Sequence, residues 1–139
     1  MTFAGINLVA VLAAAVASWL AGAVWYTLLA RPWMIALGKT KAELMRPDGK
    51  PSPAPFVVAF LAECLMAAVL ASFLARAGAA ALPAAGLVTA ALAWIGFVAT
   101  TLATNHGFGG QSPMLTVIDG GHWLVVLLLQ GAILSLIDP

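Results

Sequence analysis

The stretch that decides the fold is Pro113–Ile137, which reads PMLTVIDGGHWLVVLLLQGAILSLI. It is nearly all apolar, and at about 1.5 Å of rise per residue a helix of this length crosses the ~30 Å hydrocarbon core of a bilayer. Asp119, His122 and Gln130 interrupt it. Because a helix turns about 100° per residue, all three fall on one face with Val126. We therefore predict a membrane-spanning helix whose polar seam needs partners elsewhere in the chain.

The composition excludes an ordinary soluble domain. Of the 139 residues, 63% are hydrophobic and 8% are charged, against about 25% charged in soluble domains. A soluble fold of this size has too high a surface-to-volume ratio to bury so much apolar surface. The net charge of +1, without a basic tract, indicates no nucleic-acid partner. The single cysteine, Cys64, excludes an intramolecular disulfide.

The chain divides into apolar segments that meet the ~20-residue requirement for a spanning helix. We expect these helices at about 3–29, 56–75, 84–104 and 113–137. The fold class predicted for residues 1–139 is a single, all-α transmembrane domain, a polytopic four-helix bundle. No Lys or Arg precedes the first apolar run, so it is interpreted as a retained helix and not as a signal peptide.

The connection 30–55 is the only long one expected. Thr40-Lys41-Ala42-Glu43 has the spacing of a capping box, which predicts a short helix at about Lys41–Arg46. Five of the six basic residues lie in this connection, and Arg76 lies in the next. The positive-inside rule then makes loop 30–55 cytoplasmic and puts both termini on the outer (periplasmic) side. The five are Arg31, Lys39, Lys41, Arg46 and Lys50.

Small residues recur along one face of three of the expected helices, which lets neighbouring backbones approach closely. We therefore expect a tightly packed bundle. The residues are Ala10, Ala14, Ser18 and Gly22 in the first helix, Ala59, Glu63, Ala67 and Ala71 in the second, and Ala93, Gly96, Thr100 and Ala103 in the third.

Several motifs together resemble the domain of unknown function 1761 family of small bacterial membrane proteins. The motifs are Gly22-Ala23-Val24-Trp25-Tyr26-Thr27, then Arg31-Pro32-Trp33-Met34 and Gly38-Lys39-Thr40, then Trp94–Thr101 with Asn105, and Gly121-His122-Trp123-Leu124. Members tend to have Ser-Pro after Trp-Tyr, where this chain has Thr27-Leu28. The resemblance implies a multi-pass protein of the bacterial inner (cytoplasmic) membrane, and it carries no agreed activity.

Glu63 is the residue that most favours a function inside the membrane. It lies about 10 Å below the start of its predicted helix, and intramembrane acids are functional candidates. Desolvation there favours the neutral acid. The alternative is a protonated glutamate that hydrogen-bonds across helices as part of the packing.

Other polar residues are expected near the same depth, at the cytoplasmic ends of their helices. Asp119 and His122 are three residues apart, so their side chains can meet on the helix surface. Gln130, which lies deeper, is expected to form an interhelical hydrogen bond. The residues that we expect at one level are Tyr26, Glu63, Asn105, His106, Asp119 and His122.

This group of residues admits three kinds of chemistry. A carboxylate–histidine cluster can relay protons, because histidine titrates near neutral pH. His106, His122, Glu63 and Asp119 offer imidazole and carboxylate ligands for a divalent metal, but no H-x-x-x-H or H-E-x-x-H spacing supports one. Two histidines can also ligate a haem. We predict neither a metal nor a cofactor.

Motifs typical of enzymes are missing from the sequence: it has no nucleophile elbow, phosphate-binding glycine loop or paired-cysteine site. The leading hypothesis is a non-enzymatic protein that acts by helix packing within the lipid bilayer, as a self-oligomer or an accessory subunit of a larger membrane complex. The alternative is a small proton or cation transporter or channel that uses Glu63, Asp119 and His122. A membrane enzyme is the third possibility.

Overall fold

The computed structural model describes residues 2–3, 6–77 and 83–137. Among these residues, four helices are long and apolar enough to cross a membrane, which confirms the predicted all-α fold. The first, second and fourth are α1 (Leu8–Leu28), α3 (Ala54–Ala77) and α6 (Pro113–Ile137). The third span runs through α4 (Pro83–Ala93), a π-helix η2 (Trp94–Ala99) and α5 (Thr100–Phe108).

Before α1, two short strands form an antiparallel pair, β1 (Thr2–Phe3) with β2 (Ile6–Asn7). The helix begins at Leu8 because the side chain of Asn7 caps it: Asn7 Oδ1 accepts hydrogen bonds from the backbone N–H groups of Val9 and Ala10. The predicted start at Phe3 was therefore wrong. An asparagine that satisfies the free N–H groups of the first turn fixes the boundary at the next residue.

The connection predicted at 30–55 begins with a helix, α2 (Ala30–Leu37), directly after Leu29. It ends at Gly38, which has a φ of 70° and so adopts the left-handed conformation typical of a helix C-terminus. A single 3₁₀ turn, η1 (Ala42–Leu44), replaces the predicted helix Lys41–Arg46.

Glu43 reaches back to Thr40, as the capping-box pattern predicts. Glu43 Oε2 accepts hydrogen bonds from the Thr40 backbone N–H, at 2.7 Å, and from the Thr40 hydroxyl, at 2.6 Å. These two hydrogen bonds hold the pKa of the Glu43 carboxyl below its usual value. The side chain of Glu43 thus fixes the turn that follows α2.

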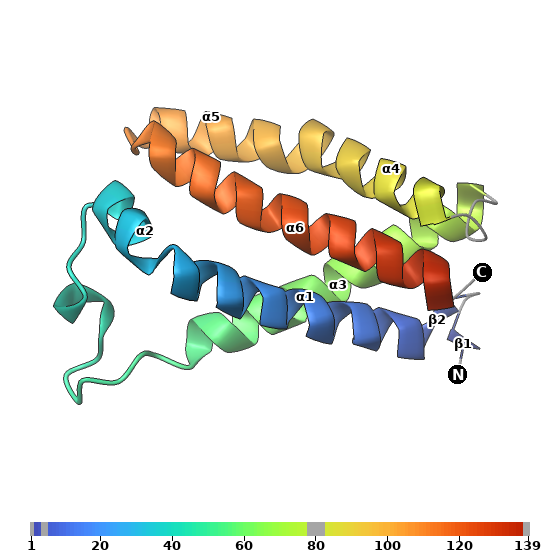
Figure 1. The fold of residues 1–139 in the computed structure, drawn as a ribbon, viewed down its shortest axis with the longest axis horizontal. Helices are drawn as coiled ribbons and strands as arrows, with labels where there is room; N and C mark the ends of the chain where they lie inside the picture. The colour runs from blue at the N-terminus through green and yellow to red at the C-terminus, as the bar shows by residue number, and fades with distance from the viewer. Residues whose placement is uncertain (1, 4–5, 78–82, 138–139) are drawn as a thin grey trace.

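Helix α6 lies between α1 and the α4–α5 span, and α3 crosses behind α1 and α6 (Figure 1). The start of α1 and the end of α6 lie at one end of the bundle, and α2 and the following loop lie at the other (Figure 1). The buried core joins α1, α3, α4 and α6 and is rich in alanine, as the small-residue faces predict. It consists of Ala10, Val11, Ala14, Ala67, Leu70, Ala71, Leu74, Ala90, Leu127 and Leu134.

Two glycines set the contact between α4 and α6. A Cβ added at Gly86 would overlap the Gly131 carbonyl oxygen and Ser135 Oγ, and a Cβ at Gly131 would overlap the Gly86 carbonyl oxygen. The two backbones therefore approach closely enough that only glycine fits, which is the usual basis of tight helix packing in membranes.

Gly96 does not take part in this packing, so the prediction that it does was wrong within this chain. It is exposed, and a Cβ there would meet nothing within 4 Å. Thr100 and Ala103, predicted on the same face, are exposed too. Periodicity predicts which residues share a face but not which way that face points. The third span contacts α6 through Gly86, Ala90 and Trp94, and this contact leaves the row that contains Gly96 on the outside.

Candidate functional site

Glu63 is buried where α1, α3 and α6 meet. Its side chain is 1% exposed, and Ser18 and Gln130, its neighbours from α1 and α6, are fully buried. Ser18 Oγ lies 2.5 Å from Glu63 Oε2. The Gln130 amide Nε2 donates to Ser18 Oγ at 3.0 Å and to the Glu63 backbone carbonyl at 3.1 Å. We call these three residues the Glu63 cluster.

The contacts of Ser18 show which hydrogen bonds fit together. Its hydroxyl has one hydrogen, yet Oγ also lies 3.1 Å from the Ala15 carbonyl oxygen, which can only accept. The Gln130 amide nitrogen can only donate. The Ser18 hydroxyl donates to Glu63 or to Ala15, and when it donates to Ala15 a protonated Glu63 carboxyl can donate to Ser18 in turn. The contacts are therefore compatible with a neutral carboxylic acid that is hydrogen-bonded directly to Ser18.

A second polar group lies nearer the α2 end of the bundle. Asp119 Oδ1 accepts hydrogen bonds from the Tyr26 hydroxyl at 2.8 Å and from the Trp33 indole N–H at 3.2 Å. The rings of Tyr26 and Trp33 also pack edge to face, with centroids 5.5 Å apart. With His122, these residues form what we call the Asp119 cluster. Its hydrogen bonds and ring contacts hold α2 and the end of α1 against α6.

His122 is buried in this cluster but does not pair with Asp119 through a hydrogen bond. Its ring packs against Tyr26 and Trp123, with centroids 4.9 and 4.7 Å away. Among the described residues, its Nδ1 atom is buried with no hydrogen-bond partner. Gly22 makes room for the ring, since a Cβ there would lie 2.7 Å from His122 Nε2. The carboxylate expected to orient the imidazole is used by Tyr26 and Trp33 instead.

Two further tryptophans hold α6 through its backbone, a role that the sequence analysis did not predict. The indole N–H of Trp25 donates to the Ile118 carbonyl at 3.1 Å, and that of Trp94 donates to the Gly120 carbonyl at 2.8 Å. The indole ring of Trp25 lies so close to Gly121 that a Cβ there would be 2.9 Å from Cζ2. The sequence feature that could have predicted this role is the indole N–H group, because a buried N–H needs a hydrogen-bond acceptor.

The structure separates Glu63 from Asp119, so the prediction of one shared level was wrong for Glu63. Glu63 lies beside Gln130, which is about 16 Å farther along α6 than Asp119. The reason is that α3 begins late: the Phe56 carbonyl accepts from the Trp19 indole at 3.1 Å, and α1 continues about 14 Å beyond Trp19. Figure 1 shows α3 beginning closer to the middle of the bundle than α6 does.

His106 and Asn105, at the end of the third span, are not hydrogen-bonded to either cluster. His106 Nδ1 lies 3.0 Å from Thr116 Oγ1, and Asn105 is exposed, with its backbone carbonyl accepting from Gly109. Within residues 2–3, 6–77 and 83–137, no three His, Cys, Asp or Glu side chains lie close enough to hold a metal ion. The described part of the chain therefore contains no set of ligands for the divalent metal considered above.

Together, the four spans and the inward-facing polar clusters define a class, the polytopic α-helical membrane proteins. The model of one family, described as a protein of unknown function (DUF1761), matches residues 9–135. The chain belongs to this family, which confirms the resemblance seen in the sequence. Comparison with curated proteins and with solved structures found no match.

Proposed function

We propose that this protein acts without catalysis, by packing against another membrane protein through the outer face of its third span. The observation that carries the proposal is a row of small residues on an exposed helix face: Gly96, Thr100 and Ala103 are all exposed. The third span is also the least buried of the four, with 11% of its most apolar window inside the molecule, against 44% for α6.

The outer faces of the other spans give the comparison that supports this proposal. Large exposed side chains occur on every span, among them Leu12 and Leu20 on α1, Leu61 and Leu65 on α3, and Leu92 and Phe97 on the third span, but on the third span they flank the row of small residues. Small residues gain little from lipid, but they let a second helix approach closely. The hydroxyl of Thr100 already bonds back to the Gly96 carbonyl at 2.9 Å, so burying this face leaves that group satisfied.

The Glu63 cluster supports the same proposal. Glu63 is 1% exposed: its carboxyl bonds Ser18, and its backbone carbonyl accepts from the Gln130 amide, so both contacts stabilise the packing of α1, α3 and α6. Because the Glu63 side chain is used in this packing, a function by association is expected to use the outer surface. We further propose the bacterial inner membrane as the location, with loop 30–55 in the cytoplasm, on the positive-inside rule.

Cysteine cross-linking in native membranes tests the proposal. In a Cys64→Ser background, Gly96→Cys and Ala103→Cys are expected to cross-link efficiently under mild oxidation or with a short bifunctional reagent. Leu12→Cys, on the outer face of α1 and 54% exposed, is the matched control and is expected to cross-link poorly. A product of twice the monomer mass identifies a second copy, and a heavier one identifies a larger complex. Equal cross-linking at Gly96 and Leu12 would contradict the proposal.

One observation favours a second candidate, proton or cation transport. The buried Nδ1 of His122 has no partner among the described residues and lies in the same cluster as the Asp119 carboxylate. Such a nitrogen can hold or release a proton. Glu63 lies too far along the bundle to share this site. The test is flux in proteoliposomes: His122→Gln is expected to abolish a measurable proton flux, and absence of flux in the wild-type protein rules this candidate out.

A further inference from the structure

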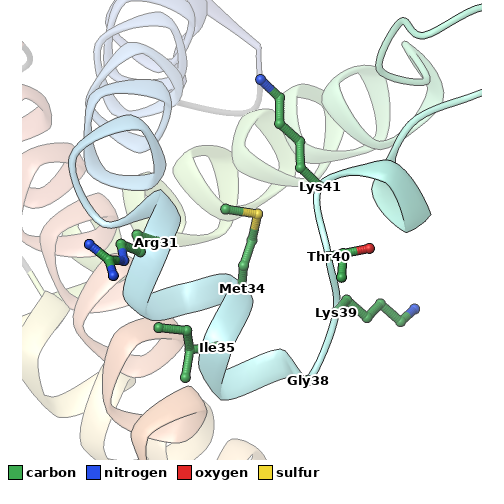
Figure 2. A pocket seen from close by; sticks show the side chains of 7 residues that line it. All are labelled: Arg31, Met34, Ile35, Gly38, Lys39, Thr40 and Lys41. Carbon is green, nitrogen blue, oxygen red and sulfur yellow. The ribbon is translucent and has the colours of Figure 1, made fainter.

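One face of α2 borders a pocket at the loop end of the bundle. Arg31, Met34, Ile35 and Gly38 have the i, i+3, i+4, i+7 spacing that places side chains on one side of a helix. The chain then turns at Gly38, and residues 39–41 form the opposite wall (Figure 2). The pocket has a volume of about 350 Å³. It lies outside both polar clusters and on a different part of the surface from Gly96.

The pocket combines an apolar floor with an excess of positive charge. Met34 reaches into the space between α2 and the 39–41 segment, and Ile35, which is 72% exposed, lies beside it on α2 (Figure 2). Arg31, Lys39 and Lys41 stand at the edge and extend in different directions (Figure 2). Long basic side chains of this kind lay their stems on apolar surface and can turn their charged ends toward an anion.

These three cations have no salt-bridge partner in the part of the chain that the structure describes, where the one salt bridge is Arg46–Asp48 at 3.4 Å. The nearby carboxylate of Glu43 accepts both of its hydrogen bonds from Thr40, and it offsets one of the three positive charges. The pocket therefore keeps a net positive charge, which makes it complementary to an anion.

The position of α2 determines which anion would meet the pocket. The helix follows α1 without a flexible linker, and Trp33 ties it to Asp119 near the start of α6. This is the end of the membrane-spanning segments, where tryptophan and basic residues lie among lipid headgroups. The basic residues at the rim suit a phosphate at this level, and Met34 and Ile35 suit the apolar carbons attached to it.

We propose that this pocket binds the headgroup of an anionic phospholipid from the adjacent leaflet. The recognised chemistry is a phosphate with no compensating positive group, attached to an apolar chain. Basic pockets at the ends of transmembrane helices are suited to such headgroups. The proposal does not depend on the association through Gly96, and either can fail without the other.

Native mass spectrometry of the full chain in detergent tests the proposal with a defined probe. The protein is offered equal amounts of phosphatidylglycerol and phosphatidylcholine with the same acyl chains. The wild-type protein is expected to retain phosphatidylglycerol preferentially. Neutralising Arg31, Lys39 and Lys41 together as glutamines is expected to reduce that preference by about tenfold or more. All three residues are exposed, so loss of folding is not expected.

The matched control removes the same charge elsewhere: Arg46→Gln, Lys50→Gln and Arg76→Gln together are expected to change the preference by less than about twofold. Equal losses in the two triple variants would show general attraction to charge and overturn the proposal, as would a wild-type protein without preference. A competition experiment with inorganic phosphate distinguishes binding of a lipid from binding of free phosphate. Millimolar inorganic phosphate is expected to leave the bound lipid in place, and displacement of the lipid would overturn the assignment to a lipid.

Discussion

Replacing Ser18 by alanine tests whether the Glu63 cluster holds three helices together. Ser18 Oγ lies 2.5 Å from Glu63 Oε2 and accepts from Gln130 Nε2 at 3.0 Å, so its removal breaks two interhelical hydrogen bonds. Interhelical bonds of this kind average about 0.6 kcal/mol each in a membrane protein. The Glu63 carboxyl also loses a side-chain partner while 1% exposed, and leaving a buried polar group unpaired costs about 1–3 kcal/mol.

Ser18→Ala is therefore expected to lower the free energy of unfolding by about 1–3 kcal/mol. Ser72→Ala is a closely matched control. The Ser72 hydroxyl donates to the Ala68 carbonyl at 2.8 Å within its own helix, as Ser18 does to Ala15, but among the described residues it forms no interhelical hydrogen bond. Its loss is expected to change stability by less than about 0.5 kcal/mol.

The assay is reversible unfolding in mixed micelles, followed by far-ultraviolet circular dichroism at one fixed pH. Infrared spectroscopy supplies a second measurement. The carbonyl stretch of a protonated carboxylic acid is expected in the wild-type protein, shifted by Ser18→Ala and absent in Glu63→Gln. If Ser18→Ala costs no more than Ser72→Ala, the cluster does not contribute to the packing of the bundle. If no such band exists, Glu63 is ionised and accepts the hydrogen bond from Ser18.

Three further predictions concern other parts of the chain. Gly131→Ala is expected to destabilise the bundle by about 1–3 kcal/mol, because the new methyl group overlaps the facing backbone. Gly96→Ala is the control: its methyl group meets nothing within 4 Å, so the stability of the monomer in detergent is expected to change by less than about 0.5 kcal/mol. Chemical unfolding measures both variants. Thr40→Ala is expected to raise the pKa of Glu43 toward its ordinary value by removing the first of its two hydrogen bonds, measured by NMR titration of the carboxyl carbon. Because the folded pKa is lowered, the stabilisation from these bonds is present above the ordinary carboxyl pKa and is lost as the pH falls through the lowered value. Asp48→Cys, in a Cys64→Ser chain, is expected to react with a membrane-impermeant maleimide only after the cells are opened, and labelling of intact cells would reverse the proposed orientation.

The sequence predicted those features that depend on local periodicity. The bounds of α6 agree with the prediction, because apolar content and flanking Pro113 determine where this helix begins. The buried row of Ala10, Ala14 and Ser18 follows from the same reasoning, since small residues at four-residue spacing form one face. The prediction for Gly96 was wrong because periodicity groups residues on a face but does not set the rotation of the helix, and the third span packs on α6 through Gly86, Ala90 and Trp94 instead.

The partners within the two clusters lay beyond what periodicity can determine. Counting residues from the start of its own helix predicts the depth of Glu63 only if all helices begin at the same level. The start of α3 relative to α1 is set by packing, through the contact between Trp19 and Phe56. The bond from Trp33 to Asp119 depends on α2, which was not predicted: this helix follows α1 directly and brings Trp33 against α6.

The separation of the two clusters bears on what the bundle can do. A relay between Glu63 and His122 would have to cross about 12 Å of α6, from Gln130 to His122, past the fully buried Val126. Each cluster instead joins helices through direct bonds, α1, α3 and α6 in one and α1, α2 and α6 in the other. Helix α6 is common to both clusters, and the third span is held to α6 separately, by the Gly86–Gly131 contact and by the hydrogen bond from Trp94 to the Gly120 carbonyl. The polar side chains of the two clusters thus join α1, α2 and α3 to α6, whereas close backbone approach joins the third span to it, so that substitutions in either cluster are expected to leave the α4–α6 contact in place.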